Sequence, residues 1–190
     1  MGFLDTLLGR TKPVQANLDN LFSLPGAALT LEAGTDFRPT GSGSVCFRSA
    51  EGRAFSDIEK DVRELLAMGE GKKPVQVSHD SFGFTWLVCS HDPGDPEGLV
   101  TDLHAVNSSL ELGGFGPQLL CTIMAFQDSS DISLGLVYLY KRGTFYPFAP
   151  RSGKRRDNAL ELQVRGVLGA DLKIEPELGR WFPVWGAPGL

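Results

Sequence analysis

Three histidines are the first residues of this chain that suggest a metal or acid–base site. His79 and His91 bracket one predicted strand, and His104 lies on the helix predicted to follow it. A strand of about ten residues separates its ends by roughly 30 Å, since each residue rises about 3.3 Å. His79 and His91 can therefore share a metal only if the chain folds back between them. The sequence contains no His-Glu-x-x-His helix and no Cys-x-x-Cys pair. We expect His79 and His91 to be turn residues at the ends of the strand and predict no metal site.

The other candidates for chemistry are thiol nucleophiles and closely spaced carboxylates. Cys46, Cys89 and Cys121 are odd in number, far apart and set in apolar sequence, which predicts buried thiols in a reducing compartment. Burial raises the pKa of a thiol and makes it inert. No Gly-x-Ser-x-Gly elbow occurs, and Asp92 and Asp95 fall in a turn where we expect solvated side chains. The sequence therefore predicts no catalytic residue and a protein that is not an enzyme.

Two glycine-rich stretches could in principle bind a nucleotide cofactor. Neither 41–43 (GSG) nor 113–116 (GGFG) is followed by the Gly-Lys-Ser/Thr of a phosphate loop. The glycines at 114 and 116 begin a G-x-G pattern, but a strand is predicted next, where a dinucleotide fold needs a helix. We predict no cofactor.

The most distinctive stretch is 134–156, which reads LGLVYLYKRGTFYPFAPRSGKRR. A core strand is predicted over 134–140, and a basic, aromatic loop over 141–156. Bases beside amphipathic aromatics suit an anionic surface, either phospholipid headgroups, an acidic partner helix or nucleic acid. The candidate contacts are Lys141, Arg142, Arg151, Lys154, Arg155 and Arg156. The alternative is that the aromatics Tyr138, Tyr140, Phe145 and Phe148 are core residues and that the bases mark a solvated loop.

The N-terminal segment 1–12, MGFLDTLLGRTK, is a second candidate contact. Its apolar residues share one helical face, and Pro13 stops the helix. Such a short helix is marginal alone in water. It either packs on its own domain or docks on a partner or a membrane interface. The candidate contacts here are Phe3, Leu4, Leu7 and Leu8.

Length and composition bound the class of protein. The chain has 190 residues, 42% of them hydrophobic and 22% charged, with a net charge of −5. These values predict a globular domain over 13–190 after the short segment 1–12. The acidic balance argues against a nucleic-acid partner. No apolar run approaches the roughly 18 residues that span a bilayer, and the N-terminus lacks the features of a secretory signal. We predict a cytoplasmic protein, either free or peripheral on the inner face of the membrane.

Periodicity predicts an α+β fold in which about three helices pack on a mostly antiparallel sheet. Helices are expected over 17–24, closed by Pro25 and Gly26, over 56–68, and after the caps Asp95 and Asp157. The helix after Asp157 is less clear, because its apolar residues also alternate. Strands are expected over 27–31, 44–48, 74–79, 82–90, 119–126 and 132–140, with the last two forming a hairpin. The segment 178–190 is expected to be an extended tail laid against the domain.

Four runs of sequence resemble a known family. They are MGFLDTLLGRTKPV at the start, FGPQLLC at 115–121, VYLYKRGTFYPFAP at 137–150, and NALELQVRG with RWFPVWGAPGL toward the end. With these runs the chain resembles PspAB, the phage-shock-protein-A-associated family, over essentially its full length. The resemblance supplies no catalytic motif to carry over.

The resemblance implies a role in an envelope stress response built around the membrane-remodelling protein PspA. It implies an accessory or adaptor protein whose partner is a PspA-like protein or another phage-shock component, with an HtpX-like membrane protease as a further associate. An anionic membrane surface is the second implied contact. From the residues alone, the rival hypothesis is a chaperone-like module that cradles a client peptide. An open apolar groove away from the basic stretch would favour that rival.

Overall fold

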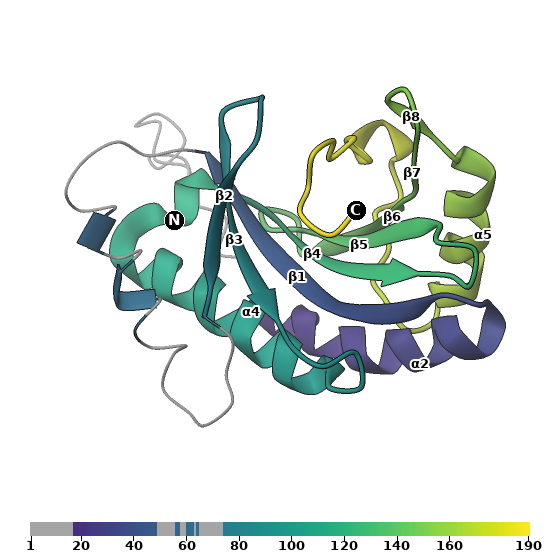
Figure 1. The fold of residues 1–190 in the computed structure, drawn as a ribbon, viewed down its shortest axis with the longest axis horizontal. Coiled ribbons are helices and arrows are strands. Elements are labelled where there is room, and N and C mark those ends of the chain that lie inside the picture. The colour runs from purple at the N-terminus through teal and green to yellow at the C-terminus, as the bar shows by residue number, and fades with distance from the viewer. Residues whose placement is uncertain (1–16, 49–55, 58–59, 63, 65–73) are drawn as a thin grey trace, which may run out of the picture.

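A six-stranded antiparallel sheet forms the centre of the computed structural model, which describes residues 17–48, 56–57, 60–62, 64 and 74–190 (Figure 1). The strand order is β2-β3-β1-β4-β5-β6, and every pairing is antiparallel. The strands are β1 (Arg38–Arg48), β2 (Gln76–His79), β3 (Phe84–Ser90), β4 (Leu119–Gln127), β5 (Ser133–Leu139) and β6 (Thr144–Phe148). A separate pair consists of β7 (Pro150–Arg151) and β8 (Arg155–Arg156). The predicted α+β class, with a mostly antiparallel sheet, is confirmed.

Among the described elements, α2 (Leu24–Gly34), α4 (Pro96–Leu110) and α5 (Asn158–Leu168) are α-helices that cover one face of this sheet. The predicted caps are confirmed, because Asp95 accepts a hydrogen bond from the Gly98 N–H and Asp157 from the Leu160 N–H, at 2.9 and 3.0 Å. Short helical turns flank them at η1 (Leu18–Ser23), η2 (Glu111–Phe115), η3 (Gly116–Gln118) and η4 (Leu178–Arg180). None of the helices in the described ranges is long and apolar enough to cross a membrane.

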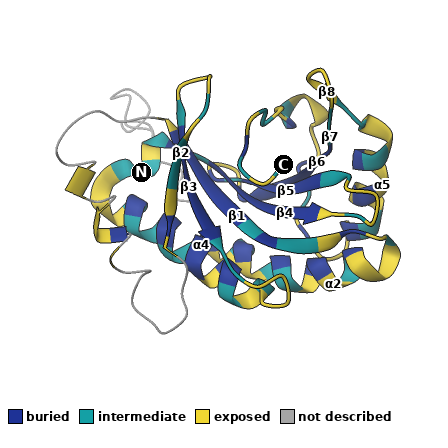
Figure 2. Ribbon diagram, in the orientation of Figure 1, coloured by how far each residue is buried: buried dark blue, intermediate teal, exposed yellow. Residues whose placement is uncertain are grey.

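The opposite face of the sheet is covered by the C-terminal segment instead of by helices. Figure 1 shows α2 and α4 along one side of the sheet and this segment, in yellow, on the other. Strand alternation sends Leu87 and Cys89 to the helical side, and Trp86 and Val88 to the tail side. Both faces of the central strands are therefore buried, as the dark blue of Figure 2 shows. The predicted packing of the tail against the domain is confirmed by the burial of Trp181 and Ala187.

The segment 24–34 differs from its prediction. A helix closed by Pro25 and a strand over 27–31 were expected, yet one continuous helix, α2, runs from Leu24 to Gly34. Proline fits the first turn of a helix, where its missing N–H would have no intrahelical acceptor anyway. The buried residues of α2 are Leu24, Ala27, Ala28 and Leu31, spaced as on one helical face. The preceding turn, η1, buries Leu18 and Leu21, whereas Phe22 is exposed.

Two further segments are more regular than their sequence suggests. The predicted loop 141–156 contains β6, β7 and β8, and β1 begins at Arg38 instead of residue 44. The pairing of β1 with β4 shifts register between Pro39 and Gly43. Gly41 lies inside that shift with φ of 75°, and a Cβ there would stand 2.4 Å from the His91 carbonyl oxygen. Only glycine fits this bulge.

The remaining predicted elements fall partly outside the described residues. The strands at β2, β3, β4 and β5 are confirmed, as is the β4–β5 hairpin. Of the predicted helix 56–68, the described residues at 56–57, 60–62 and 64 are helical, and Val62 is buried. The predicted N-terminal helix with Phe3, Leu4, Leu7 and Leu8 lies outside the described residues, so the division at residue 12 stays a prediction.

Candidate functional site

An apolar cavity of about 560 Å³ lies between the tail side of the sheet and the C-terminal segment. Its floor is formed by side chains from neighbouring strands, namely Cys46, Trp86, Cys121, Leu139 and Tyr146. Its roof is formed by the segment 182–185, and Phe82 and Phe84 from the β2–β3 hairpin close one end. Ligand sites of small molecules are typically concave, mostly apolar and about 300–1,000 Å³ in volume. The cavity therefore has the size and character of a ligand site.

Two facing thiols form part of the cavity floor. Cys46 and Cys121 are direct partners across the β1–β4 pairing, and both are buried and free. The pKa of the Cys46 thiol is raised, first by its hydrogen bond with Cys121 and then by burial. The Cys46 thiol therefore stays protonated, which makes it a poor nucleophile. Cys89 is also buried, so the expectation of buried thiols is confirmed for all three cysteines.

Asp80 and Tyr146, two polar side chains of the cavity wall, are already hydrogen-bonded. Asp80 accepts from the Trp86 indole N–H at 2.9 Å and from the N–H groups of Phe82 and Phe84 at 2.8 and 3.0 Å. Burial alone would raise the pKa of Asp80, but the Phe84, Trp86 and Phe82 donors lower it below its ordinary value. The Tyr146 hydroxyl donates to the Phe182 carbonyl oxygen at 2.7 Å, which ties the floor to the roof.

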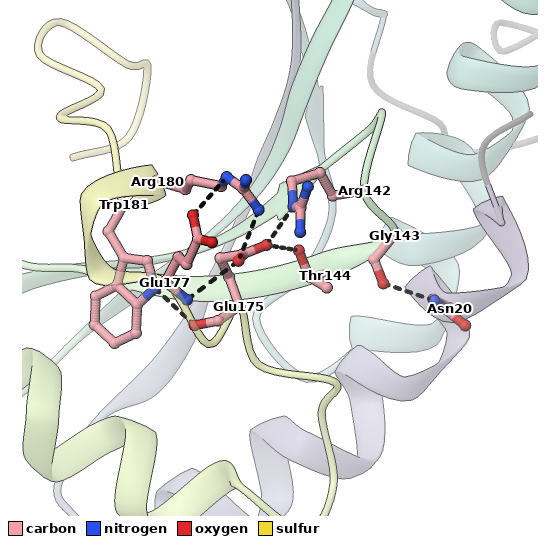
Figure 3. Close-up of polar contacts among 8 residues, drawn as sticks. All are labelled: Asn20, Arg142, Gly143, Thr144, Glu175, Glu177, Arg180 and Trp181. Atoms are coloured by element: carbon pink, nitrogen blue, oxygen red, sulfur yellow. Dashed lines mark hydrogen bonds and ion pairs between the residues drawn. The ribbon is translucent and has the colours of Figure 1, made fainter. Parts of the chain in front are cut away.

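A fully buried carboxylate, Glu175, anchors the start of the roof (Figure 3). Its Oε2 accepts hydrogen bonds from Arg142 Nε at 2.6 Å and from the Thr144 hydroxyl at 2.8 Å. Arg180 lies 3.7 Å from Oε1, which also accepts from the Glu177 N–H at 3.2 Å. Burial raises the pKa of Glu175, but the Arg142, Thr144 and Glu177 donors together hold it below its ordinary value. The tail is therefore fixed to β6 by a charged residue that stays ionised.

The backbone around Glu175 extends the sheet. The Phe145 N–H donates to the Lys173 carbonyl at 2.9 Å, and the Glu175 N–H donates to the Phe145 carbonyl at 2.7 Å. Ile174 forms a parallel bridge with Phe145. These bonds bring the chain from α5 back along β6 before it crosses over the cavity.

Trp181 and Arg156 form a second anchor of the tail. The Trp181 ring stacks on Tyr146 with centroids 6.0 Å apart, and its indole N–H donates to the Glu175 carbonyl at 3.0 Å. Arg156 binds the buried carboxylate of Glu161 at 2.9 Å and also donates to the Trp181 carbonyl. The C-terminal segment is thus held by β6, β8 and α5 at once.

The basic residues singled out in the sequence fall into two groups. Three form ion pairs within the domain: Arg142 with Glu175, Arg151 with Asp157, and Arg156 with Glu161. The other three, Lys141, Lys154 and Arg155, are exposed. The aromatics Tyr138, Tyr140, Phe145 and Phe148 are all buried, which confirms the interpretation of these residues as core. Partner contact by the bases stays a prediction, and so does contact by residues 3, 4, 7 and 8.

Sequence reasoning missed Glu175 and the cavity. Glu175 stands in the ordinary sequence IEPELGR, and its partners Arg142 and Thr144 lie 33 and 31 residues away. The one available signal was the alternation of Trp86 and Val88 with Leu87 and Cys89, which indicated a strand buried on both faces. This alternation did not show that the C-terminal segment would cover one face of the sheet, or that a cavity would lie beneath that segment.

The histidines are placed as structural contacts. His91 is hydrogen-bonded at both ring nitrogens, to Asp95 at 2.9 Å and Asp102 at 2.8 Å, which ties the end of β3 to α4. His79 contacts the Thr85 hydroxyl, and the His104 ring lies against Phe22 at a tilt of 34°, with the ring centroids 4.8 Å apart. Within the described ranges, no group of three or more His, Cys, Asp or Glu side chains is placed to hold a metal ion. His91 does not line the cavity.

His91 should make stability depend on pH. Burial lowers its pKa, but the bonds to Asp102 and Asp95 more than offset this and raise it above its ordinary 6.5. A raised folded-state pKa stabilises the fold fully below the unfolded pKa, and the effect is lost as pH rises through the folded value. We expect His91→Gln to cost roughly 1 kcal/mol at pH 6 and clearly less at pH 9.

Urea unfolding at both pH values measures this difference, with His79→Gln as the matched control. A cost for His91→Gln that is equal at pH 6 and pH 9 would show that the two carboxylates do not stabilise an imidazolium here.

Comparison with known proteins gives one match. A family model described as PspAB, PspA associated protein B, matches residues 1–189. No curated protein and no solved structure matches the chain.

Proposed function

The chain belongs to the PspAB family, PspA associated protein B, and from this premise we propose that it is a non-enzymatic accessory protein of a PspA-type envelope stress response. In this role it binds a PspA-like protein directly, as an adaptor in the cytoplasm or on the inner face of the membrane. An HtpX-like membrane protease is a further partner in the same system.

The observation that supports partner binding is an exposed aromatic and basic surface at the edge of the cavity. Phe82 is 51% exposed and Phe182 is 58% exposed, and both line the cavity. Lys154 lies over the Phe82 ring, 5.0 Å from its centroid, and Lys141 is exposed on the same rim. Large aromatic side chains that stay exposed beside cations are typical of protein interfaces, where aromatics supply most of the binding energy. We call these four residues the rim surface.

The charges favour a protein partner over a bilayer as the main contact. Each Lys or Arg near an anionic membrane contributes about 1 kcal/mol. Three of the six predicted basic contacts are engaged in ion pairs with Glu175, Asp157 and Glu161. The three exposed bases, Lys141, Lys154 and Arg155, supply only a weak attraction to an anionic membrane. On a protein partner, the exposed aromatic side chains contribute binding energy in addition to these charges.

The cavity also bears on the rival function, a chaperone-like module that cradles a client. An open apolar groove away from the basic stretch would have supported this rival. The cavity is apolar, but its rim includes Lys141 and Arg142, the first residues of that stretch. The tail also crosses over it, which leaves little room for an extended client peptide.

Binding to a purified PspA-like protein from the same organism tests the proposal. We expect the double variant Phe82→Ser/Phe182→Ser to bind at least about tenfold more weakly, since buried aromatic anchors dominate interfaces. The matched control is Leu29→Ser/Leu162→Ser, which removes two exposed apolar residues of α2 and α5. Biolayer interferometry gives the affinities. The proposal is wrong if the wild-type chain does not bind, or if the rim and control variants bind equally.

A further inference from the structure

We propose that the cavity binds a free single-chain amphiphile with an anionic head, of the fatty-acid type, with its chain along the cavity and its carboxylate at Lys141 and Arg142. This inference goes beyond the proposed function and does not depend on a PspA partner. It follows from the cavity's size, from the saturation of its polar groups and from the cations at its rim.

The walls of the cavity offer apolar contact along its whole length. The floor contains Trp86, Leu120, Leu139 and the two facing thiols, and Val184 and Trp185 form part of the roof. Burying apolar surface here releases about 25 cal/mol per Å². A flexible hydrocarbon chain can fill such an irregular space, and the volume of about 560 Å³ suits a ligand of one chain.

The polar groups of the wall argue against a peptide occupant. Asp80 already accepts from two backbone N–H groups and one indole, and the Tyr146 hydroxyl already donates to Phe182. A peptide backbone would bring N–H and C=O groups that need partners, and each one buried without a partner costs free energy. A hydrocarbon chain brings none of these groups.

The rim supplies donors for an anionic head. Lys141 is exposed, and it forms no ion pair with any of the described residues. Arg142 donates its Nε to Glu175 (Figure 3), and within the described ranges the terminal nitrogens of its guanidinium form no hydrogen bond. Arg180 lies on the same rim, although Glu175 and Glu177 offset its charge. An anion placed here meets a lysine and the outer edge of an arginine, so a carboxylate head is preferred to a neutral or cationic one.

The position of the cavity favours a free amphiphile over a lipid held in a bilayer. The ligand's hydrocarbon chain must pass beneath the segment 182–185. Tyr146 holds this segment at Phe182, and Arg156 and Glu175 hold the preceding residue, Trp181. A lipid could reach this site only after it left the membrane, and the cavity volume of about 560 Å³ suits a ligand with one chain.

Quenching of tryptophan fluorescence by 12-bromododecanoate, kept below its micelle concentration, tests the proposal on the full chain. Bromine quenches on contact, and Trp86 and Trp185 line the cavity. We expect saturable quenching by the carboxylate and at least about tenfold weaker binding of 12-bromododecan-1-ol. Lys141→Glu should weaken carboxylate binding about tenfold and leave the alcohol unchanged. Arg165→Glu, an exposed charge change on α5, is the matched control.

A second variant tests the location without relying on charge. Leu120→Trp narrows the floor and should abolish saturable quenching, while its circular dichroism and unfolding midpoint report whether it still folds. Absence of saturable quenching in the wild-type protein overturns the proposal. Equal affinity for carboxylate and alcohol overturns the role of the cations. Binding to phosphatidylglycerol vesicles without binding of the monomeric carboxylate overturns the assignment to a free chain. These outcomes are independent of binding to a PspA-like protein.

Discussion

Replacing Trp181 with alanine should lower the free energy of unfolding by about 3–5 kcal/mol, the range observed when a large buried aromatic is truncated. Trp181 is almost fully buried and stacks on Tyr146. Its indole N–H donates to the Glu175 carbonyl, and its own carbonyl accepts from Arg156. The substitution therefore opens a void and also leaves the buried Glu175 carbonyl without its indole donor.

Urea unfolding followed by circular dichroism measures this loss. The matched control is Phe182→Ala, the neighbouring residue, which is exposed and should change stability by less than about 0.5 kcal/mol. An unchanged unfolding midpoint for Trp181→Ala, together with new proteolytic cleavage within 178–190, would contradict the prediction. That result would show that the tail detaches alone and contributes little to the stability of the sheet.

Replacing Glu175 with alanine should cost about 2–4 kcal/mol, because a buried charged acceptor with several donors is removed. The Thr144 hydroxyl would remain buried without its acceptor, and Arg142 and Arg180 would lose their shared anion. Both arginines keep part of their hydration, since their side chains are 42% and 36% exposed, which holds the cost below that of a fully buried pair. Glu175→Gln keeps the shape and should cost about half as much.

The pH dependence separates the charge of Glu175 from its shape. Its folded pKa lies below the ordinary 4.5, so the ionised carboxylate contributes stability above that value and the contribution is lost as pH falls through the folded pKa. The gap in stability between the wild type and Glu175→Gln should be constant from pH 6 to 8 and shrink below about pH 4.5. A gap that does not change with pH would show that the charge is not what holds the tail.

Trp181 and Glu175 matter for the two proposed binding functions because they hold the roof of the cavity in place. The tail supplies the segment 182–185 to the cavity and Phe182 to the rim surface. A variant that loosens the tail should therefore weaken both the proposed partner binding and the proposed ligand binding. Interpretation of either binding assay requires variants whose tail is shown to stay docked.

Local interactions are what the sequence by itself determined. The caps Asp95 and Asp157 bond to N–H groups three residues on, and the β4–β5 hairpin joins neighbouring strands, so short-range patterns predicted both. The error at 24–34 has the same origin: Pro25 and Gly26 favour a turn locally, yet the packing of four apolar residues on the sheet stabilises a helix.

Only the tertiary structure decided which distant residues meet. Cys46 faces Cys121 because β4 pairs with β1, and Glu175 meets Arg142 because the chain returns along β6 after α5. It also showed that half of the predicted basic contacts are paired within the domain. Such pairings depend on the order of the strands in the sheet. They also depend on which face the helices cover and which face the C-terminal segment covers. Neither feature leaves a short-range signal in the sequence. The cavity has the same origin, because the C-terminal segment covers its face of the sheet without filling all the space above the strands.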